Sequence, residues 1–202
     1  MFKLFKEQSI ENAFNLVRQN INRKVDNIPK YDIMEENHDN LVKRISMKIQ
    51  PLEIDFQSRK GKLDNEEING QNFPQGYDVE PDKNYECAKA VYSFKITGDT
   101  ELFAVEPKGK IFQKNVKASN NKNYLFIEYQ TFSKQPLNEN KINEIKDFIR
   151  ETIRLMKDFI PVINNEIDTF NNQMNDYIKV QLKERKRQLQ LKRSQDDNIN
   201  DL

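Results

Sequence analysis

The stretch that decides the fold is INEIKDFIRETIRLMKDFIPVINNEIDTFNNQMNDYI, residues 142–178. Its large apolar side chains recur at alternating steps of three and four, which is the period of one face of an α-helix. We call these eleven positions the seam: Ile142, Ile145, Ile149, Ile153, Met156, Ile160, Ile163, Ile167, Phe170, Met174 and Ile178. A stripe of this length needs a cover. The pattern therefore predicts a long helical segment over 138–193 that packs on the rest of the chain or on a second subunit.

One residue interrupts the seam. Pro161 has no backbone N–H, and its ring crowds the preceding helical turn. The sequence therefore predicts either a helical hairpin or one kinked helix, with the break after Ile160. The polar residues 194–202 that follow the helix are predicted to be a linker.

The segment 179–193 loses the seam and becomes basic. Its cations oppose a single acid, Glu184, and are Lys179, Lys183, Arg185, Lys186, Arg187, Lys192 and Arg193. They are candidate phosphate contacts, because each neutralised phosphate adds to a salt-dependent affinity. However, they spread around the helix, and no aromatic residue lies among them to stack on a base. A solvated helix is the favoured interpretation, with a nucleic-acid-binding helix as the alternative.

N-terminal to the seam, the apolar residues follow a period of two, which is typical of strands. Two runs flank Pro51: Ile45, Met47 and Ile49 before it, and Leu52, Ile54 and Phe56 after it. YSFKITGDTELFAVEP, residues 92–107, predicts a hairpin that turns at Gly98–Asp99. KIFQKNVKA and NYLFIEYQTF predict two further strands, whereas 61–83 is polar and predicts a long acidic loop. Together they predict about five or six antiparallel strands with one apolar face.

The first residues read as a helix. Apolar side chains recur at helical spacing, at Ile10, Ala13, Phe14, Val17, Ile21 and Val25, and Pro29 ends the pattern. The predicted fold is therefore α+β: an N-terminal helix, a small antiparallel β-sheet, and a long C-terminal helical hairpin or kinked helix. Its predicted parts are 1–137 (helix plus sheet), 138–193 (long helical segment) and 194–202 (linker).

The residue types for most catalytic and metal sites are scarce. Cys87 is the only cysteine and His38 the only histidine, which excludes an intramolecular disulfide and a Cys/His zinc site. A nucleophilic cysteine would need His38 as its base, and the glycine-rich motifs that bind phosphate are absent. The sequence therefore predicts no catalytic residue, no metal ligand, no cofactor and no identifiable small molecule.

The start of the chain predicts its compartment. MFKLFKEQSIENAF carries Glu7 and Glu11 where a signal peptide has its apolar run. No stretch approaches the roughly 20 apolar residues of a membrane span. We therefore expect a cytoplasmic protein that does not contact a membrane.

Three stretches of the sequence carry a family resemblance. YSFKITGDTELFAVEP, together with NNEIDTFNNQM and the charged KERKRQL run, resembles the N-terminal module of bacterial defence-associated proteins of unassigned function. The resemblance covers roughly residues 88–202. It implies that a separate restriction-endonuclease-like domain follows the module, in components of anti-phage defence loci. It transfers no catalytic residue to this chain, because none of the matching positions is catalytic in that pattern.

These observations predict a non-enzymatic assembly or sensing module of an anti-phage defence effector. It would self-associate, or hold a defence-system partner, through the long helix, because the seam exceeds what the N-terminal helix alone covers. The alternative is a nucleic-acid-binding module that guides DNA to a tethered nuclease through 179–193. A third hypothesis is that the sheet and its acidic loop bind a small molecule or a phage protein.

Overall fold

The computed structural model describes residues 1–200 and has an α+β fold, as the sequence predicts. Its helices are α1 (Ile10–Asp26), α2 (Lys30–Glu35), α3 (His38–Ile45) and α4 (Glu139–Asn200), with two short 3-10 helices, η1 (Gly70–Asn72) and η2 (Thr100–Ala104). Its strands are β1 (Phe2–Lys3), β2 (Gln8–Ser9), β3 (Glu53–Asn69), β4 (Asn84–Thr97), β5 (Val105–Glu106), β6 (Lys117–Asn120) and β7 (Tyr124–Gln130).

The chain folds as two compact units. Unit 1 combines Met1–Ser9 with Pro51–Asn164, and unit 2 combines Ile10–Gln50 with the part of α4 that follows Asn164. The division therefore crosses α4, whereas the sequence analysis placed a boundary between residues 137 and 138. The apolar spacing of α4 is the same on both sides of the division, because the helix packs against a core in each unit. The spacing therefore does not reveal where one unit ends and the other begins.

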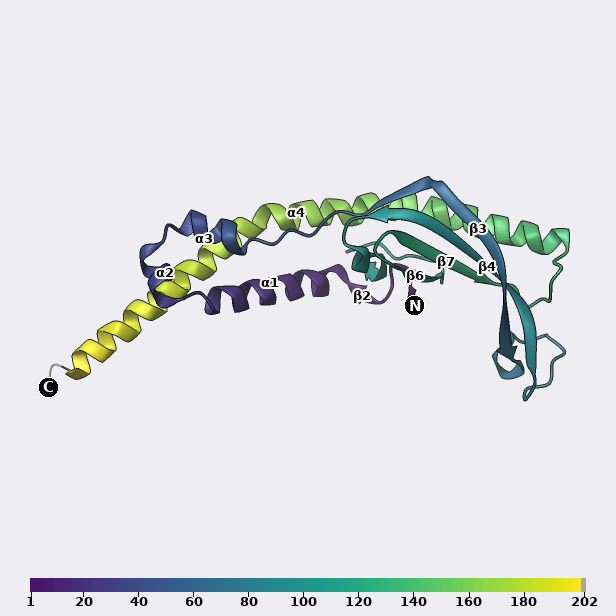
Figure 1. Cartoon of the computed structure of the whole chain (residues 1–202), viewed down its shortest axis with the longest axis horizontal. Coiled ribbons are helices and arrows are strands. Elements are labelled where there is room, and N and C mark those ends of the chain that lie inside the picture. Colours follow the sequence, from purple (N-terminus) through teal and green to yellow (C-terminus); the bar gives the residue numbers. More distant parts are fainter. Residues whose placement is uncertain (201–202) are drawn as a thin grey trace. The chain divides into compact units, whose positions relative to one another are not determined.

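Unit 1 is built on a five-stranded antiparallel sheet in the order β1-β6-β7-β4-β3, and β2 and β5 form a separate parallel pair. The first half of α4 lies along one face of the sheet (Figure 1). Phe94 of β4 and its ladder partner Leu125 of β7 are fully buried. Tyr129 of β7 meets Phe148 of α4, with 4.6 Å between ring centroids. One apolar sheet face packed on one helix face forms this core.

An aromatic cluster closes the core of unit 1 beside the sheet. The Phe5 ring lies 5.4 Å from that of Phe112 and 5.7 Å from that of Phe159, between centroids. Phe103 completes the cluster at 6.1 Å from Phe5. These rings tie the N-terminal segment, η2 and the loop that carries Phe112 to α4, because buried aromatic side chains carry large apolar areas.

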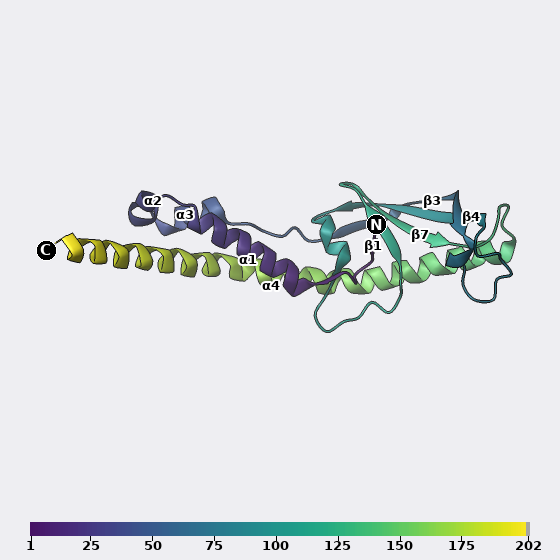
Figure 2. The ribbon, with the colours of Figure 1, turned by 90° about the horizontal axis from the view of Figure 1, so that it is seen from below.

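Unit 2 is a small helical bundle, in which α1, α2 and α3 gather along the second half of α4 (Figures 1 and 2). Phe14 of α1 stacks on Phe170 of α4, with 4.2 Å between centroids. Ile21 of α1 and Leu41 of α3 are fully buried against the same core. The predicted N-terminal helix is therefore present as α1, and it begins at Ile10.

Two asparagines of α4 bind extended backbone that no strand pairs. Within unit 2, Asn171 accepts the N–H of Ile49 at 3.1 Å and donates to its C=O at 2.9 Å. Within unit 1, Asn164 makes the same two bonds to Leu52, at 2.8 and 2.9 Å. Each side chain therefore satisfies both backbone groups of one residue, as a neighbouring strand would.

The predicted strand through Ile45, Met47 and Ile49 is wrong. Leu41, Val42 and Ile45 are buried at helical spacing, and Asn37 caps α3 by accepting the N–H of Asp39 at 2.8 Å. Residues 46–52 after α3 are not in a strand. The apparent period of two arises because Ile45 is the last residue of α3 and Ile49 belongs to the following segment, whose backbone Asn171 binds.

The predicted hairpin at Gly98–Asp99 is also wrong, because residues 100–104 form η2. Leu102 and Phe103 are adjacent and both buried, which a strand with alternating faces does not allow when one face is solvated. Gly98 has a φ of 91°, and a Cβ there would lie 1.9 Å from the C=O oxygen of Pro51. Strand β4 pairs with β3 and β7 instead.

The predicted loop at 61–83 is shorter, because β3 continues to Asn69. The ladder between β4 and β7 starts at Lys89, so the pairs of β3 and β4 beyond it form a two-stranded ribbon (Figure 1). Such a ribbon has few apolar residues to reveal it. The strand predicted over KIFQKNVKA is only β6, since Phe112 is buried in the aromatic cluster instead.

The long C-terminal segment is one helix, and the hairpin alternative is wrong. Pro161 lies inside α4 with its own side chain exposed, while Ile160 and Ile163 on either side are buried. The packing on both sides holds the helical path that the proline disfavours. Residues 194–200 of the predicted linker belong to α4, and residues 201–202 lie outside the described part. Over residues 1–200, no helix is long and apolar enough to cross a membrane.

We expect Asn171→Ala and Asn164→Ala each to lower the free energy of unfolding by about 1–3 kcal/mol, because each leaves a partly buried N–H and C=O without their acceptor and donor. Urea denaturation followed by circular dichroism measures this change. Asn172→Ala is the matched control, since Asn172 is exposed on the same helix. Equal stability of the Asn171 and Asn172 variants would contradict the assigned role.

Candidate interaction site

Most of the seam is buried by other parts of the same chain. Nine of its eleven residues are buried, whereas Ile142 is 36% exposed and Ile153 is half-buried. Positions 145–163 face the core of unit 1, whereas 167–178 face the core of unit 2, which Leu182 extends. The buried positions are therefore not available to a second subunit in this structure.

Four of the seven candidate phosphate contacts are engaged by unit 2 or by their own helix. Lys179 pairs with Asp39 at 3.0 Å, which lowers the pKa of that carboxyl through a hydrogen bond and the charge. Arg185 donates to the C=O of Asp26 at 2.9 Å, and Lys186 donates to that of Met34 at 2.9 Å. Both carbonyls lie near the ends of α1 and α2, where cations are favoured by the helix dipole.

The rest of the basic run lies on the exposed end of α4. Arg187 bonds Glu184 at 2.7 Å, and with Gln188 it lowers the pKa of Glu184 to about 2. That carboxylate stays charged at neutral pH and offsets one cation of the run. Lys183, Lys192 and Arg193 have no hydrogen bond or ion pair within residues 1–200, so the basic surface is reduced to these three.

The two residues considered for nucleophilic chemistry lie in different units. Cys87 is buried in β4 of unit 1, and His38 begins α3 in unit 2. Burial raises the pKa of the Cys87 thiol, with a smaller contribution from the Glu66 carboxylate. The described residues include no group of three or more His, Cys, Asp or Glu side chains that could hold a metal ion.

Strand β3 is one edge of the sheet, because within residues 1–200 it pairs only with β4. The N–H of Ala88 in β4 donates to Ser133, and its C=O accepts from Thr131, so these groups point away from β3. Asn65 lies opposite Ala88, and backbone direction alternates along antiparallel strands. Every second residue of this stretch therefore points its N–H and C=O outward: Gly61, Leu63, Asn65 and Glu67.

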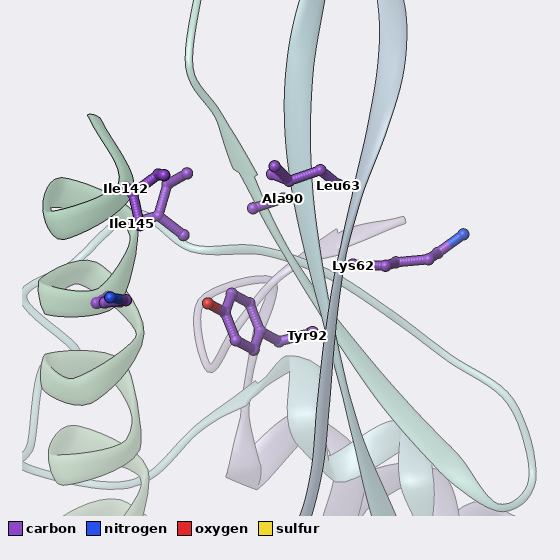
Figure 3. Close-up of a pocket in the computed structure, with 8 residues that line it drawn as sticks. Lys62, Leu63, Ala90, Tyr92, Ile142 and Ile145 are labelled. Atoms are coloured by element: carbon purple, nitrogen blue, oxygen red, sulfur yellow. The ribbon is translucent and has the colours of Figure 1, made fainter. Parts of the chain in front are cut away.

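A pocket of about 250 Å³ lies between this edge and α4 (Figure 3). The strands line it with Gly61, Lys62, Leu63, Ala90 and Tyr92, and α4 lines it with Ile142, Ile145 and Lys146. Figure 3 shows the Tyr92 hydroxyl directed toward the helix, while the ammonium end of Lys62 points away from it. The lining is mostly apolar, and it also includes the Tyr92 phenol and the side chains of two lysines, Lys62 and Lys146.

Gly61 fixes the shape of the pocket. It lies directly opposite Tyr92 in the ladder, and a Cβ at Gly61 would lie 2.7 Å from Cε1 of that ring. The absent side chain therefore lets the Tyr92 ring lie against the edge strand. Two residues at the pocket expose apolar surface: Leu63 is 43% exposed and Ile142 is 36% exposed.

We call β3 residues 60–66 and the adjoining pocket the edge site. The edge site was not predicted, because the polar residues 61–83 indicate a loop and Ile142 follows the spacing of the seam. The sequence does carry one sign of a strand here. Gly61 and Leu63 are uncharged and alternate with the charged residues Lys60, Lys62 and Asp64, after the β-bulge between Asp55 and Lys60.

Comparison of the chain with protein-family models, with curated proteins and with solved structures gives no match. The edge site is therefore interpreted from its own geometry.

We expect Cys87 in the folded protein to react with dithiobis(nitrobenzoate) far more slowly than in urea at mildly alkaline pH. The thiolate is the reacting form, and burial both raises the thiol pKa and blocks access. The native rate should rise only as the pH passes above the ordinary thiol pKa. A native rate equal to the rate in urea would show that Cys87 is accessible.

Proposed function

We propose that the chain is a non-enzymatic assembly and sensing module that binds an extended protein segment at the edge site. One observation carries the proposal: the outward backbone groups of β3 lie beside an apolar pocket with exposed Leu63 and Ile142. In strand addition, main-chain hydrogen bonds supply affinity, and a neighbouring pocket supplies specificity for a side chain. The edge site combines both features.

The proposal keeps the assembly role that the sequence suggested but moves it to another surface. The seam supports the cores of the two units, so assembly falls to a part of unit 1 that remains exposed. The setting in an anti-phage defence effector, and the tethered nuclease, rest on the resemblance of residues 88–202. In that setting the module would hold an effector in register when its segment is bound.

Nucleic-acid binding through residues 179–193 is the alternative, and Lys183, Lys192 and Arg193 favour it by lacking carboxylate partners within residues 1–200. Because the other cations are engaged, we expect no binding of a short DNA duplex at physiological salt by fluorescence anisotropy. Binding that weakens steeply with salt, and that is lost in Lys183→Gln/Lys192→Gln/Arg193→Gln, would support the alternative instead.

The pocket itself is tested with anilinonaphthalene sulfonate, an apolar dye with one negative charge. We expect dye fluorescence to rise on addition of the protein, because the lining is apolar and includes the Lys146 ammonium. The signal should fall several-fold in Ile142→Glu, which places a carboxylate at the pocket.

Val180→Glu is the matched control for the dye experiment. Val180 is 59% exposed on the same helix but lies in unit 2, away from the pocket lining. Its substitution should leave the signal unchanged. Equal signals from wild type and Ile142→Glu would remove the pocket as a binding site.

A further inference from the structure

We propose that the segment bound at the edge site is β3 of a second copy of this chain. The inference rests on the proposed function, and it names the partner. In the dimer the two β3 strands would run antiparallel about a two-fold axis at Leu63, joining two five-stranded sheets into one. A two-fold contact of this kind requires a surface that is complementary to itself.

The charges of β3 have that complementarity. With Leu63 on the axis, Lys62 lies opposite Asp64 of the second copy, and Lys60 lies opposite Glu66 of the second copy. The symmetry repeats both pairs on the other side of the axis. Opposite charges directly across antiparallel strands are favourable, and like charges are unfavourable.

Neighbouring registers are disfavoured by the same charges. An axis at Gly61 would place Lys60 opposite Lys62, and an axis at Asn65 would place Asp64 opposite Glu66. Charged edge strands normally prevent uncontrolled pairing. Of these three registers, only the one with its axis at Leu63 places opposite charges across from each other on both sides of the axis.

The backbone fits the same register. Leu63 points its N–H and C=O outward, so the two copies of Leu63 can exchange both hydrogen bonds as a closely bonded pair. Gly61 and Asn65 also point outward and lie opposite each other across the axis. The seven residues 60–66 belong to the regular part of the β3–β4 ladder, after the bulge.

The side chains on the α4 face fit as well. Leu63 of the second copy would lie beside Leu63 and diagonal to Gly61, which has no side chain to block it. It would cover apolar surface at the pocket, including exposed Ile142. The side chain of Asn65, which bonds Glu86 at 2.7 Å, would face the bare backbone of Gly61.

Pairing with a second copy would replace ion pairs of the single chain that contribute little to its stability. Lys62 bonds Asp64 of its own strand at 2.7 Å, and Glu66 lies 3.3 Å from Lys89, but these side chains of β3 are 39–67% exposed. Exposed ion pairs contribute little to stability, so exchanging them across the axis is nearly neutral. Lys60 has no ion pair in the described part of the chain and would gain one.

The test is the solution mass by light scattering of two charge-reversal variants and of their mixture. Wild type, 24.1 kDa as a single chain, should approach twice this mass as its concentration rises. Lys60→Glu/Lys62→Glu should stay at the single-chain mass, and so should Asp64→Lys/Glu66→Lys. Mixing the two variants should restore the doubled mass, because each then meets the charge it lacks.

Lys183→Glu/Lys192→Glu is the matched control for Lys60→Glu/Lys62→Glu, because it makes the same change in net charge on exposed residues of unit 2. It should dimerise like wild type, and circular dichroism should show all variants folded. A wild type that stays monomeric at every concentration, or reversal variants that each dimerise like wild type, would overturn the inference. Dye binding at the pocket, measured at a protein concentration where wild type has the single-chain mass, reports separately on the proposed function.

Discussion

The structure depends on one constraint: a long apolar stripe on a single helix has to be covered. The sheet of unit 1 covers seam positions from Ile145 to Ile163, and α1 and α3 of unit 2 cover those from Ile167 onward. Asn164 and Asn171 lie between these apolar positions and bind backbone that would otherwise lack hydrogen bonds. The helix therefore contributes one side of the core of each unit. In both units it does so with the same residue types, large apolar side chains and one asparagine that binds backbone.

The parts of the fold that were predictable are those with a strong period. The seam and α1 carry repeated helical spacing, and β7 carries a clear alternation, so all three were anticipated. The errors fall where a tertiary contact overrides the local pattern. Leu102 and Phe103 enter a helical turn because both must be buried, and Met47 and Ile49 lie in extended backbone that has a side chain in place of a strand partner.

The edge site was hidden from the sequence for a related reason. Residues 65–69 of β3 lie in a ribbon that extends beyond the sheet and needs no apolar face, and residues 61–64 form an edge with a single large apolar side chain. The polar stretch from residue 61 therefore predicted a loop. Once β3 is known to be an edge strand, its charged residues indicate how it can pair with a second copy. Lys60 and Lys62 precede Leu63, and Asp64 and Glu66 follow it, so the charge changes sign at Leu63. Because the seam is buried and this edge is exposed, we propose that assembly uses the sheet edge rather than the helix.

The central claim, that each chain covers its own seam, is tested most directly by the concentration dependence of unfolding. The Lys60→Glu/Lys62→Glu variant is suited to this measurement, because edge pairing does not contribute to its stability. If the seam is covered within one chain, the urea midpoint stays constant over a wide range of protein concentration. A midpoint that rises with concentration would mean that a second chain helps to cover the seam, and it would contradict this account.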